Sequence, residues 1–248
     1  MPRDIFLFDV DGTLTPPKQK AIPEFINQFS KWAEDREVYL VSGGSFTRLC
    51  DQLGIDVINM MTAIFPCMGN ACYKNKPDED NAWIKVYEKN FIPPPLLERK
   101  LDSIVEKSEY PIKTGRHYEN RVGMINFSVV GRNANSLQRK KYAEYDAEFK
   151  EREKIIKKLR KSYSTIDFVI GGAVSIDIFP KGNDKSQIIK SYFKPMPRNA
   201  RITFVGDRIK APGNDHALAK AISRYKNGHV HEVESWEDTA ELLKSSTF

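Results

Sequence analysis

Two aspartates near the N-terminus have the type and the spacing that phosphoryl chemistry needs. Asp9 and Asp11 follow directly after the apolar run 4–8, which predicts a short buried strand. Ligand sites in open α/β folds form beyond the carboxyl ends of the strands, so both carboxylates should lie at such an edge. Paired carboxylates are hard oxygen ligands that suit Mg²⁺. One aspartate can then attack phosphorus as a covalent nucleophile, and the other can protonate the leaving oxygen.

An isolated Asp-x-Asp pair is most often an ordinary turn at a strand end, but the residues around this pair are more specific. The string FDVDGTLT occupies residues 8–15, and its glycine, Gly12, permits a tight turn. Further short patterns follow in order along the chain. They are Ser-Gly-Gly-Ser at 42–45, Lys185 in the segment 180–185, and Gly-Asp at 206–207 followed by Gly-Asn-Asp at 213–215. Each of these is common alone, whereas four in this order indicate a single site.

The elements that must position these residues alternate between strand and helix at both ends of the chain. Apolar runs predict strands at 4–8, 38–41, 63–66, 201–205 and 228–233. Amphipathic or cap-like segments predict helices at 23–34, 46–53, 185–192, after 214–215, and at 237–244. Such alternation is typical of a parallel sheet with helices on both faces.

The middle of the chain has a different pattern. After the polar, turn-forming segment 74–81, it predicts a helix at 96–108, strands at 124–130, 168–170 and 173–179, and one long charged helix at 136–161. Gly171 and Gly172 predict a hairpin turn between the last two strands. We therefore expect a discontinuous α/β core, residues 1–81 and 185–248, with an inserted α+β cap, residues 82–184, that contains an antiparallel sheet.

Composition narrows the classes of protein. The 248 residues carry a net charge of +6, and no apolar run approaches the roughly 18 residues that span a bilayer. We expect a cytoplasmic protein without a membrane partner. The cysteines, Cys50, Cys67 and Cys72, show no CxxC spacing and are expected to be packing or surface thiols. Mixed charges over 139–161 are typical of a solvated helix and weigh against a nucleic-acid-binding module.

The four motifs resemble those of the haloacid dehalogenase (HAD) superfamily, which implies a Rossmann-like parallel-sheet core. The resemblance implies that Asp9 is the nucleophile, that Asp11 is the general acid and base, and that Lys185 offsets negative charge. Ser42 and Ser45 are both candidates for the hydroxyl that holds the phosphoryl group, and we favour Ser42 because it directly follows the strand. The implied ligands of Mg²⁺ are Asp9, Asp11 and Asp207.

Along nearly its whole length the sequence is similar to the eukaryotic-type phosphomannomutases. The strings DVDGTLTPPKQ at 9–19, GMIN at 123–126 and GGAVSIDIFP at 171–180 carry this resemblance. In that family, cap arginines and a Ser-x-Asp pair bind the sugar phosphate that is not reacting. Carried over by position, the substrate-binding residues are Lys18, Arg121, Arg132, Arg139, Ser175 and Asp177. The chemistry agrees, because guanidinium forks bind phosphate and alternate strand residues share one face.

The sequence departs from the family pattern at residue 18 and over 42–46 and 65–70, and the segment 181–183 also varies. Lys18 stands where the family usually has an arginine, so the charge is kept and the fork is lost. The segment 42–46 reads SGGSF where the family tends to have Gly-Gly-Ser-Asp, and 65–70 reads FPCMGN in place of a Pro-Glu-Asn-Gly pattern. These departures bear on substrate choice and on the balance between transfer to sugar and transfer to water.

The resemblance implies a mutase that interconverts mannose 6-phosphate and mannose 1-phosphate and feeds GDP-mannose synthesis. It would use an aspartyl-phosphate, Mg²⁺ and a hexose 1,6-bisphosphate activator, and it would be a homodimer joined through the caps. A sugar-phosphate phosphatase of the HAD type, or activity on glucose phosphates, is the alternative that the core motifs leave open. The sequence does not separate mannose from glucose phosphates, because both present similar hydroxyls.

Overall fold

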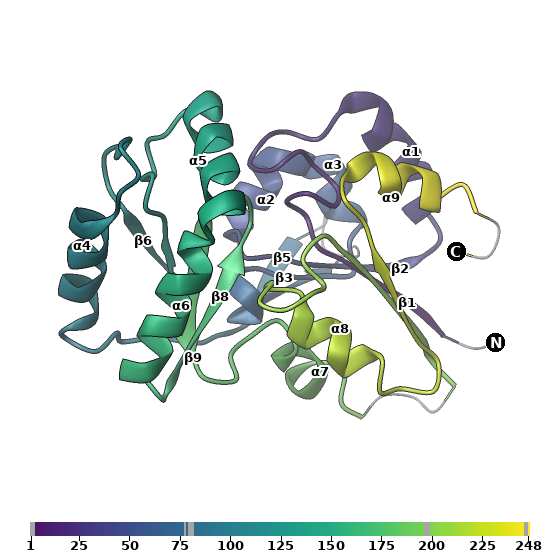
Figure 1. Ribbon diagram of the computed structural model, residues 1–248. Coiled ribbons are helices and arrows are strands. Elements are labelled where there is room, and N and C mark those ends of the chain that lie inside the picture. Colours follow the sequence, from purple (N-terminus) through teal and green to yellow (C-terminus); the bar gives the residue numbers. More distant parts are fainter. Residues whose placement is uncertain (1–2, 77, 79–81, 196–198, 246–247) are drawn as a thin grey trace.

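The computed structural model describes residues 3–76, 78, 82–195, 199–245 and 248. These residues form two lobes that lie side by side (Figure 1). The larger lobe is built on a seven-stranded sheet with helices on both faces, and the smaller on a four-stranded antiparallel sheet. The predicted fold class, an α/β core with an α+β cap, is confirmed, and we call the two lobes the core and the cap.

Parallel strands make up most of the core sheet. They are β1 (Asp4–Phe8), β2 (Glu37–Val41), β3 (Ala63–Phe65), β10 (Arg201–Gly206) and β11 (Gly228–Glu232). Each parallel pair is in register along its length, with β1 hydrogen-bonded to β10 on one side and to β2 on the other. A strand covered on both faces and both edges must be apolar throughout, which explains the sequence of β1.

An antiparallel hairpin extends this sheet beyond the boundary that the sequence predicts for the core. Strands β4 (Ala71–Lys76) and β5 (Ala82–Glu88) complete the order β11-β10-β1-β2-β3-β4-β5. The segment 74–81 was expected to be a turn, whereas residues 74–76 belong to β4. Residues 82–88 were placed in the cap, and they form an edge strand of the core sheet. Exposed side chains dominate β5, and although its sequence AWIKVYE is rich in strand-forming residues, it does not show which sheet the strand joins.

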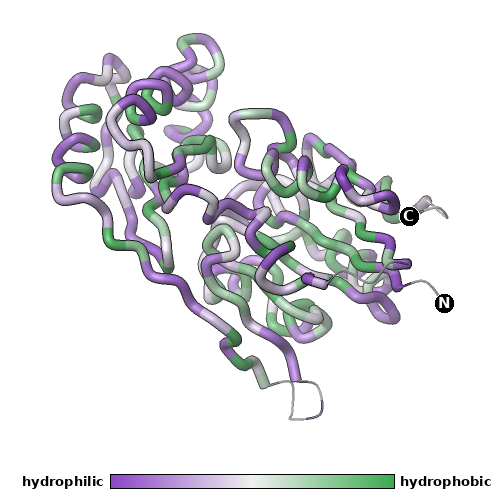
Figure 2. Tube along the Cα trace, turned by 90° about the horizontal axis from the view of Figure 1, so that it is seen from below, coloured by the Kyte–Doolittle hydropathy of each residue, from purple (hydrophilic) through white to green (hydrophobic). Residues whose placement is uncertain are grey.

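Alternate side chains of the core strands anchor helices on opposite faces of the sheet. Phe6 and Phe8 pack on one face, and Ile5 and Leu7 pack on the other. The first face is covered by α1 (Pro23–Ala33), α2 (Phe46–Leu53), α3 (Ile55–Met60) and α9 (Trp236–Leu242), and the second by α7 (Gln187–Ser191) and α8 (His216–Ile222). Figure 2 shows the hydrophobic strand segments running through the middle of the core. Among the described residues, no helix combines the length and the apolar character needed to cross a membrane.

The cap sheet separates an apolar face from a polar one. Its strands are β6 (Tyr118–Arg121), β7 (Met124–Phe127), β8 (Ile166–Gly171) and β9 (Ser175–Pro180), in the order β6-β7-β9-β8. Ile176 and Ile178 of β9 pack against α4 (Leu97–Lys107), α5 (Ser136–Phe149) and α6 (Glu151–Ser162). The period of two in a strand therefore turns Ser175 and Asp177 to the opposite face, toward the core.

The single helix predicted over 136–161 is in fact two helices. Lys150 between them has φ 53° and ψ 39°, the left-handed conformation, which ends α5 and lets α6 start in a new direction. A buried ion pair holds this break together. Arg152 donates from its main-chain nitrogen and from Nε to the two oxygens of Asp146, at 2.7 and 2.8 Å. Its Nη1 also donates to the carbonyls of Gly172 and Ser175, which fixes the hairpin turn before β9.

An apolar contact and several hydrogen bonds join the cap to the core. Cys67 and Met68, in the short 3₁₀ turn Cys67–Gly69, are buried against Met124 and Phe179 of the cap. The departure from the family pattern at 65–70 thus supplies apolar packing between the lobes.

Replacing Arg152 by Met should lower the free energy of unfolding by about 3 kcal/mol, because Asp146 would be left buried without its partner. Urea denaturation followed by circular dichroism measures the loss. Arg99→Gln, on an exposed turn of α4, is the matched control and should change stability by less than about 0.5 kcal/mol. The double replacement Arg152→Met with Asp146→Leu should recover part of the loss. Equal stability of Arg152→Met and wild type would contradict the assigned role of the pair.

Candidate active site

A buried lysine links two aspartates at the carboxyl edge of the core sheet. Lys185 donates to Asp9 Oδ1 and to Asp215 Oδ1, at 2.6 Å each, and its side chain is fully buried. Burial alone would lower the pKa of this amine, but the charges of Asp215 and Asp9 raise it, so the lysine stays protonated. Asp9 follows β1 and Asp215 follows β10, so the parallel pairing of these strands brings the two carboxylates together.

Asp207 completes an acidic cluster with these two residues. One carboxylate oxygen from each of Asp9, Asp207 and Asp215 lies within 4.8 Å of the others. Burial and the neighbouring carboxylates raise the pKa of Asp207 to about 7. Burial also raises the pKa of Asp9 well above its usual range, although Lys185 opposes this. Gly12 is required beside the cluster, since a Cβ there would approach Asp207 Oδ2 to 2.6 Å at a φ of +91°.

The donor set fits a hard divalent cation. Three carboxylates face one lysine, so negative charge remains in excess, and burial together with this excess raises the pKa of Asp207. Oxygen-only ligands at this spacing suit Mg²⁺. The expected metal ligands Asp9 and Asp207 are thus brought together, with Asp215 as the third carboxylate. The carboxylate of Asp11, the other expected ligand, lies outside this cluster.

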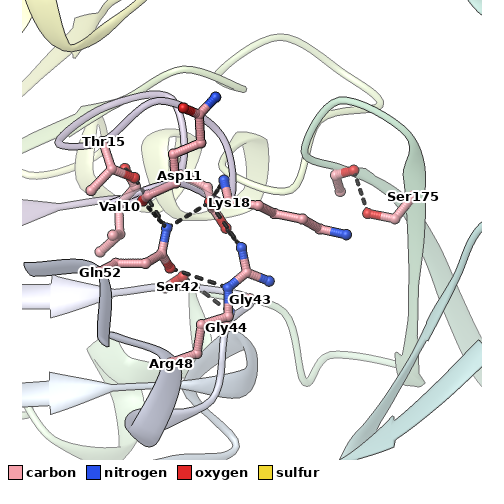
Figure 3. A network of polar contacts seen from close by, with 12 residues as sticks. Val10, Asp11, Thr15, Lys18, Ser42, Gly43, Gly44, Arg48, Gln52 and Ser175 are labelled. Atoms are coloured by element: carbon pink, nitrogen blue, oxygen red, sulfur yellow. Dashed lines mark hydrogen bonds and ion pairs between the residues drawn. The ribbon is translucent and has the colours of Figure 1, made fainter. Parts of the chain in front are cut away.

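Asp11 is held by donors from the neighbouring helix and loop (Figure 3). Arg48 Nη2 lies 3.0 Å from each carboxylate oxygen of Asp11. Gln52 Nε2 and the main-chain nitrogen of Lys18 donate to Oδ1, at 3.0 and 2.5 Å. Arg48 and Gln52 are four residues apart on α2, so they project from the same face of that helix. The carboxylate faces the pocket but is fully engaged in this arrangement.

The turn after β2 presents main-chain groups to the same pocket. Ser42 Oγ accepts a hydrogen bond from the nitrogen of Gly44 at 3.0 Å, and all of 42–44 line the pocket. Ser45 instead caps α2, where its Oγ accepts from the nitrogen of Arg48 at 3.4 Å. Of the two candidate hydroxyls, Ser42 is therefore the one that lines the pocket.

The pocket lies between the two lobes and is lined from both. The core contributes three of the four lining carboxylates, and each lobe contributes two basic side chains. The lining residues are Asp9, Asp11, Pro17, Lys18, Ser42, Gly43, Gly44, Arg48, Arg121, Asn126, Arg139, Gly171, Gly172, Ala173, Ser175, Asp177, Asp207 and Asn214. Nine of the eleven residues predicted for catalysis, metal or substrate thus border one space, and the other two, Arg132 and Lys185, lie behind the lining. Lys185 donates a hydrogen bond to the lining residue Asp9, and Arg132 donates one to the lining residue Asn126.

A shared glutamate orders the cap arginines. Glu119 accepts from Arg121 at 2.9 Å and also pairs with Arg132. Burial opposes ionisation of Glu119, but the two guanidiniums hold the pKa of this carboxyl at about 2. Arg121 Nη1 also donates to the carbonyl of Gly43 at 2.6 Å, a direct bond from the cap to the core turn. The guanidiniums are thereby fixed before any ligand arrives.

Asp177 connects the lobes through two amides. Asn126 of β7 donates to its Oδ1 at 2.6 Å, and Asn214 of the core donates to its Oδ2 at 3.3 Å. Asn214 Oδ1 is buried without a hydrogen-bond partner among the described residues, which leaves an acceptor beside the pocket. Ser175 donates to the carbonyl of Gly171 at 2.8 Å. The predicted Ser-x-Asp pair is thus at the pocket, with the aspartate already bound.

Positive charge accumulates on the side of the pocket opposite the acidic cluster. Burial and the charges of Arg132, Arg139 and others lower the pKa of Lys18 to about 6. Burial, Arg132 and Arg48 lower the pKa of Arg139 to about 10. A group of cations that lower one another's pKa values in this way indicates a binding site for a strong anion.

Several functional residues escaped the sequence analysis. Arg48 and Glu119 belong to no motif string, and Asn126 stood in the quoted string GMIN without a role; the contacts of all three are with residues not adjacent in the chain. Asn214 and Asp215 stood in a recognised string but were given no role. The spacing of Arg48 and Gln52, four residues apart after the Ser-Gly-Gly-Ser turn, is the one local signal that was available.

Solved structures show the same fold at low sequence identity. An IMP-nucleotidase of Plasmodium falciparum superposes with a TM-score of 0.66 over 98% of this chain and 68% of its own, at 15% identity. A haloacid dehalogenase-like hydrolase of Bacteroides thetaiotaomicron superposes with a TM-score of 0.55 over 98% and 99% of the two chains, at 13% identity. The core with its inserted cap therefore has a HAD-like fold.

Sequence comparison identifies the family within this class. The profile of the eukaryotic phosphomannomutases matches residues 24–247. Phosphomannomutase of Dendrobium officinale is 33% identical over 98% of this chain and 94% of its own length, and that of Drosophila melanogaster is 33% identical over 96% and 93%. The chain belongs to the eukaryotic phosphomannomutase family, a family of enzymes, and the predicted resemblance is confirmed.

Mg²⁺ affinity should rise with pH up to about pH 7 and then level off. Protons on Asp207 and Asp9 compete with the cation below that pH, because the pKa values of both carboxyls are raised. Isothermal titration calorimetry between about pH 5.5 and 8 measures the trend. Asp207→Asn should weaken binding strongly, whereas Asp56→Asn, at an exposed position on α3, should not. A pH-independent affinity would exclude this cluster as the cation site.

Lys18→Met should stabilise the unliganded protein most at low pH. The folded-state pKa of about 6 lies below the value in the unfolded chain, so the folded protein binds fewer protons between the two values. The unfavourable contribution of Lys18 is therefore full below about pH 6 and diminishes as the pH rises. The thermal midpoint of Lys18→Met should exceed that of wild type by more at about pH 6 than at about pH 9. Lys20→Met, at an exposed neighbour, is the control; an equal gain at both pH values would contradict the assignment.

Proposed function

We propose that the protein interconverts mannose 6-phosphate and mannose 1-phosphate by phosphoryl transfer through the carboxylate of Asp9. The supporting observation is that one pocket contains the nucleophile and its acidic cluster on the core side and arginines with Asp177 on the cap side. Family membership supports the same activity. The two ends of the pocket suit the two phosphate positions of one sugar.

Asp9 is the group that forms and loses the covalent bond. One oxygen of its carboxylate attacks phosphorus, and the bond from phosphorus to the sugar oxygen breaks. Lys185 stabilises the ionised carboxylate from the buried side, at 2.6 Å, and fixes its orientation. Mg²⁺ bound by Asp9, Asp207 and Asp215 would offset the charge of the phosphoryl group, so that one anion can approach another. Ser42 and the amide groups of the turn 42–44 face the transferring group.

Asp11 moves the proton that this exchange requires. In the forward direction its carboxyl donates a proton to the departing sugar oxygen, and in the reverse direction its carboxylate accepts one from the attacking hydroxyl. Asp11 lies two residues from Asp9 and lines the same pocket. Its present hydrogen bonds to Arg48 and Gln52 hold it on the pocket wall, within reach of a sugar oxygen.

The cap holds whichever phosphate is not reacting. Arg121 and Arg139 line the pocket, with Arg132 behind them, and Lys18 faces them from the core loop. Asp177 and the unpartnered Oδ1 of Asn214 offer acceptors to sugar hydroxyls between the two ends. Because both ends of the sugar must visit Asp9, the cap set has to bind a phosphate on either carbon. A dense group of cations does this better than a shaped cavity.

Catalysis by this route requires a hexose 1,6-bisphosphate as activator and intermediate. The bisphosphate phosphorylates Asp9, and the aspartyl-phosphate passes its group to the incoming hexose phosphate. Contacts between the lobes, such as the bond from Arg121 to Gly43, restrict water around the acyl phosphate.

We further propose that residues of the cap between β5 and Lys185 act as one substrate-binding unit. We also propose that the protein is a cytoplasmic homodimer joined through its caps, and that its product supplies GDP-mannose synthesis.

A coupled assay tests this function. Purified protein with Mg²⁺ and a catalytic amount of glucose 1,6-bisphosphate should convert mannose 1-phosphate into mannose 6-phosphate. Asp9→Asn keeps the shape of the nucleophile but not its charge, and the rate should fall by at least about a thousandfold. Asp56→Asn serves as the matched control. Absence of turnover by folded wild-type protein would refute the mutase proposal.

The same assay distinguishes the phosphatase alternative. If water were the normal acceptor, phosphate release from the bisphosphate would greatly exceed isomer formation. A panel of mannose and glucose phosphates would then assign the substrate. Loss of both activities in Asp9→Asn would retain Asp9 as the nucleophile in either case.

A further inference from the structure

The contacts of Arg48 distinguish it from the other cations of the pocket. Arg48 Nη2 lies 3.0 Å from both carboxylate oxygens of Asp11, and its Nε donates to Gln52 Oε1 at 3.2 Å. That contact fixes the amide of Gln52, whose nitrogen then donates to Asp11 Oδ1 at 3.0 Å. Figure 3 shows the closed triangle of the three side chains. The proton-transfer group of the proposed reaction is therefore anchored by a pair of residues on α2.

The two oxygens of Asp11 are not equivalent in this network. Oδ1 accepts from the main-chain nitrogen of Lys18, from Gln52 and from Arg48. Oδ2 accepts from Arg48 alone among the described residues. Oδ2 is thus the oxygen that can exchange a proton with a ligand, and Arg48 is the group that covers it.

Arg48 also faces the phosphate-binding cations. Its side chain lines the pocket and is only about one-fifth exposed. Lys18 and Arg139 line the same pocket. Nη1 of Arg48 makes no hydrogen bond to any described residue. The guanidinium therefore contacts Asp11 and also borders the space that an anionic ligand would occupy.

We propose that Arg48 is a positioning residue that couples phosphate binding to proton transfer by Asp11. With no sugar phosphate in the pocket, Arg48 covers Oδ2, and Asp11 cannot take a proton from water beside a phosphorylated Asp9. A bound sugar phosphate draws the guanidinium toward its own oxygens and uncovers Oδ2. Asp11 then accepts the proton of the attacking sugar hydroxyl, as the new bond to phosphorus forms and the bond to Asp9 breaks. The arrangement favours sugar over water as acceptor, and it rests on the proposed mutase function.

Gln52 separates the two parts of this role. It contacts Asp11 and Arg48 but does not line the pocket. Gln52→Met keeps the size of the side chain and removes its hydrogen bonds. This variant should lower kcat for transfer while changing KM for the hexose phosphate less than about twofold. Arg48→Gln should alter both constants, because it removes a phosphate contact as well as the cover on Oδ2.

The decisive measurement is the ratio of phosphate released to isomer formed, with glucose 1,6-bisphosphate and mannose 1-phosphate as the reactants. Arg48→Gln should raise this ratio about tenfold or more, because Oδ2 of Asp11 becomes available to water. Arg48→Lys keeps the charge but not the planar guanidinium, so its KM should lie closer to that of wild type than the KM of Arg48→Gln does. The ratio of phosphate to isomer should stay raised. Arg99→Gln is the matched control on the surface of the cap and should behave like wild type. Circular dichroism confirms that each variant is folded.

The outcomes separate this inference from the proposed function. If wild type turns over and Arg48→Gln raises KM alone, with an unchanged ratio and kcat, Arg48 is only a phosphate ligand and the inference is overturned. If Gln52→Met changes KM and leaves kcat intact, the positioning role of the pair is likewise overturned. If wild type transfers no phosphoryl group between sugars, the proposed mutase function itself fails. A raised ratio in both Arg48 variants, with the kcat-only effect of Gln52→Met, supports the inference.

Discussion

The structure depends on keeping several charges out of water at one edge of a sheet. Lys185 has no exposed side-chain area, and its partners Asp9 and Asp215 are buried with it. Burying such groups is costly unless each is paired, so their positions cannot relax without a large loss of free energy. The parallel pairing of β1 with β10 sets the distance between the two carboxylates. The apolar strands thus serve chiefly to hold these three ionisable side chains at fixed separations.

Charge is divided unequally between the lobes, and neither part is balanced by itself. The core edge carries an excess of carboxylates, and the facing cap and the loop at Lys18 carry an excess of cations. The excess on one side matches a divalent metal, and the excess on the other matches a phosphate. Both excesses appear as displaced pKa values in the same pocket, at Asp207 and at Lys18. A sugar phosphate bound beside a metal ion would balance both the excess of carboxylates and the excess of cations.

The sequence predicted the strand-end residues well and the long-range contacts poorly. Asp9, Ser42 and Asp207 follow apolar runs, and the rule that parallel strands end at a common edge was enough to bring them together. The β4–β5 hairpin was misplaced because the sequence of β5, although rich in strand-forming residues, does not show which sheet an edge strand joins. The break at Lys150 was missed because the charged pattern continues across it. The partners of Arg48 could not be predicted either, since a local pattern does not show which distant carboxylate a long side chain reaches.

The double attachment of Asp177 has a consequence for turnover. Its carboxylate accepts hydrogen bonds from Asn126 of the cap and from Asn214 of the core, and in the proposed reaction it also accepts one from the sugar. A hydroxyl that takes a place on this carboxylate must compete with the amide of one lobe. The sugar and the two amides therefore compete for the same carboxylate oxygens, and tight binding of the sugar weakens the hydrogen bond that joins the lobes. Such competition sets a limit on affinity and gives a reacted sugar a way to turn or to leave.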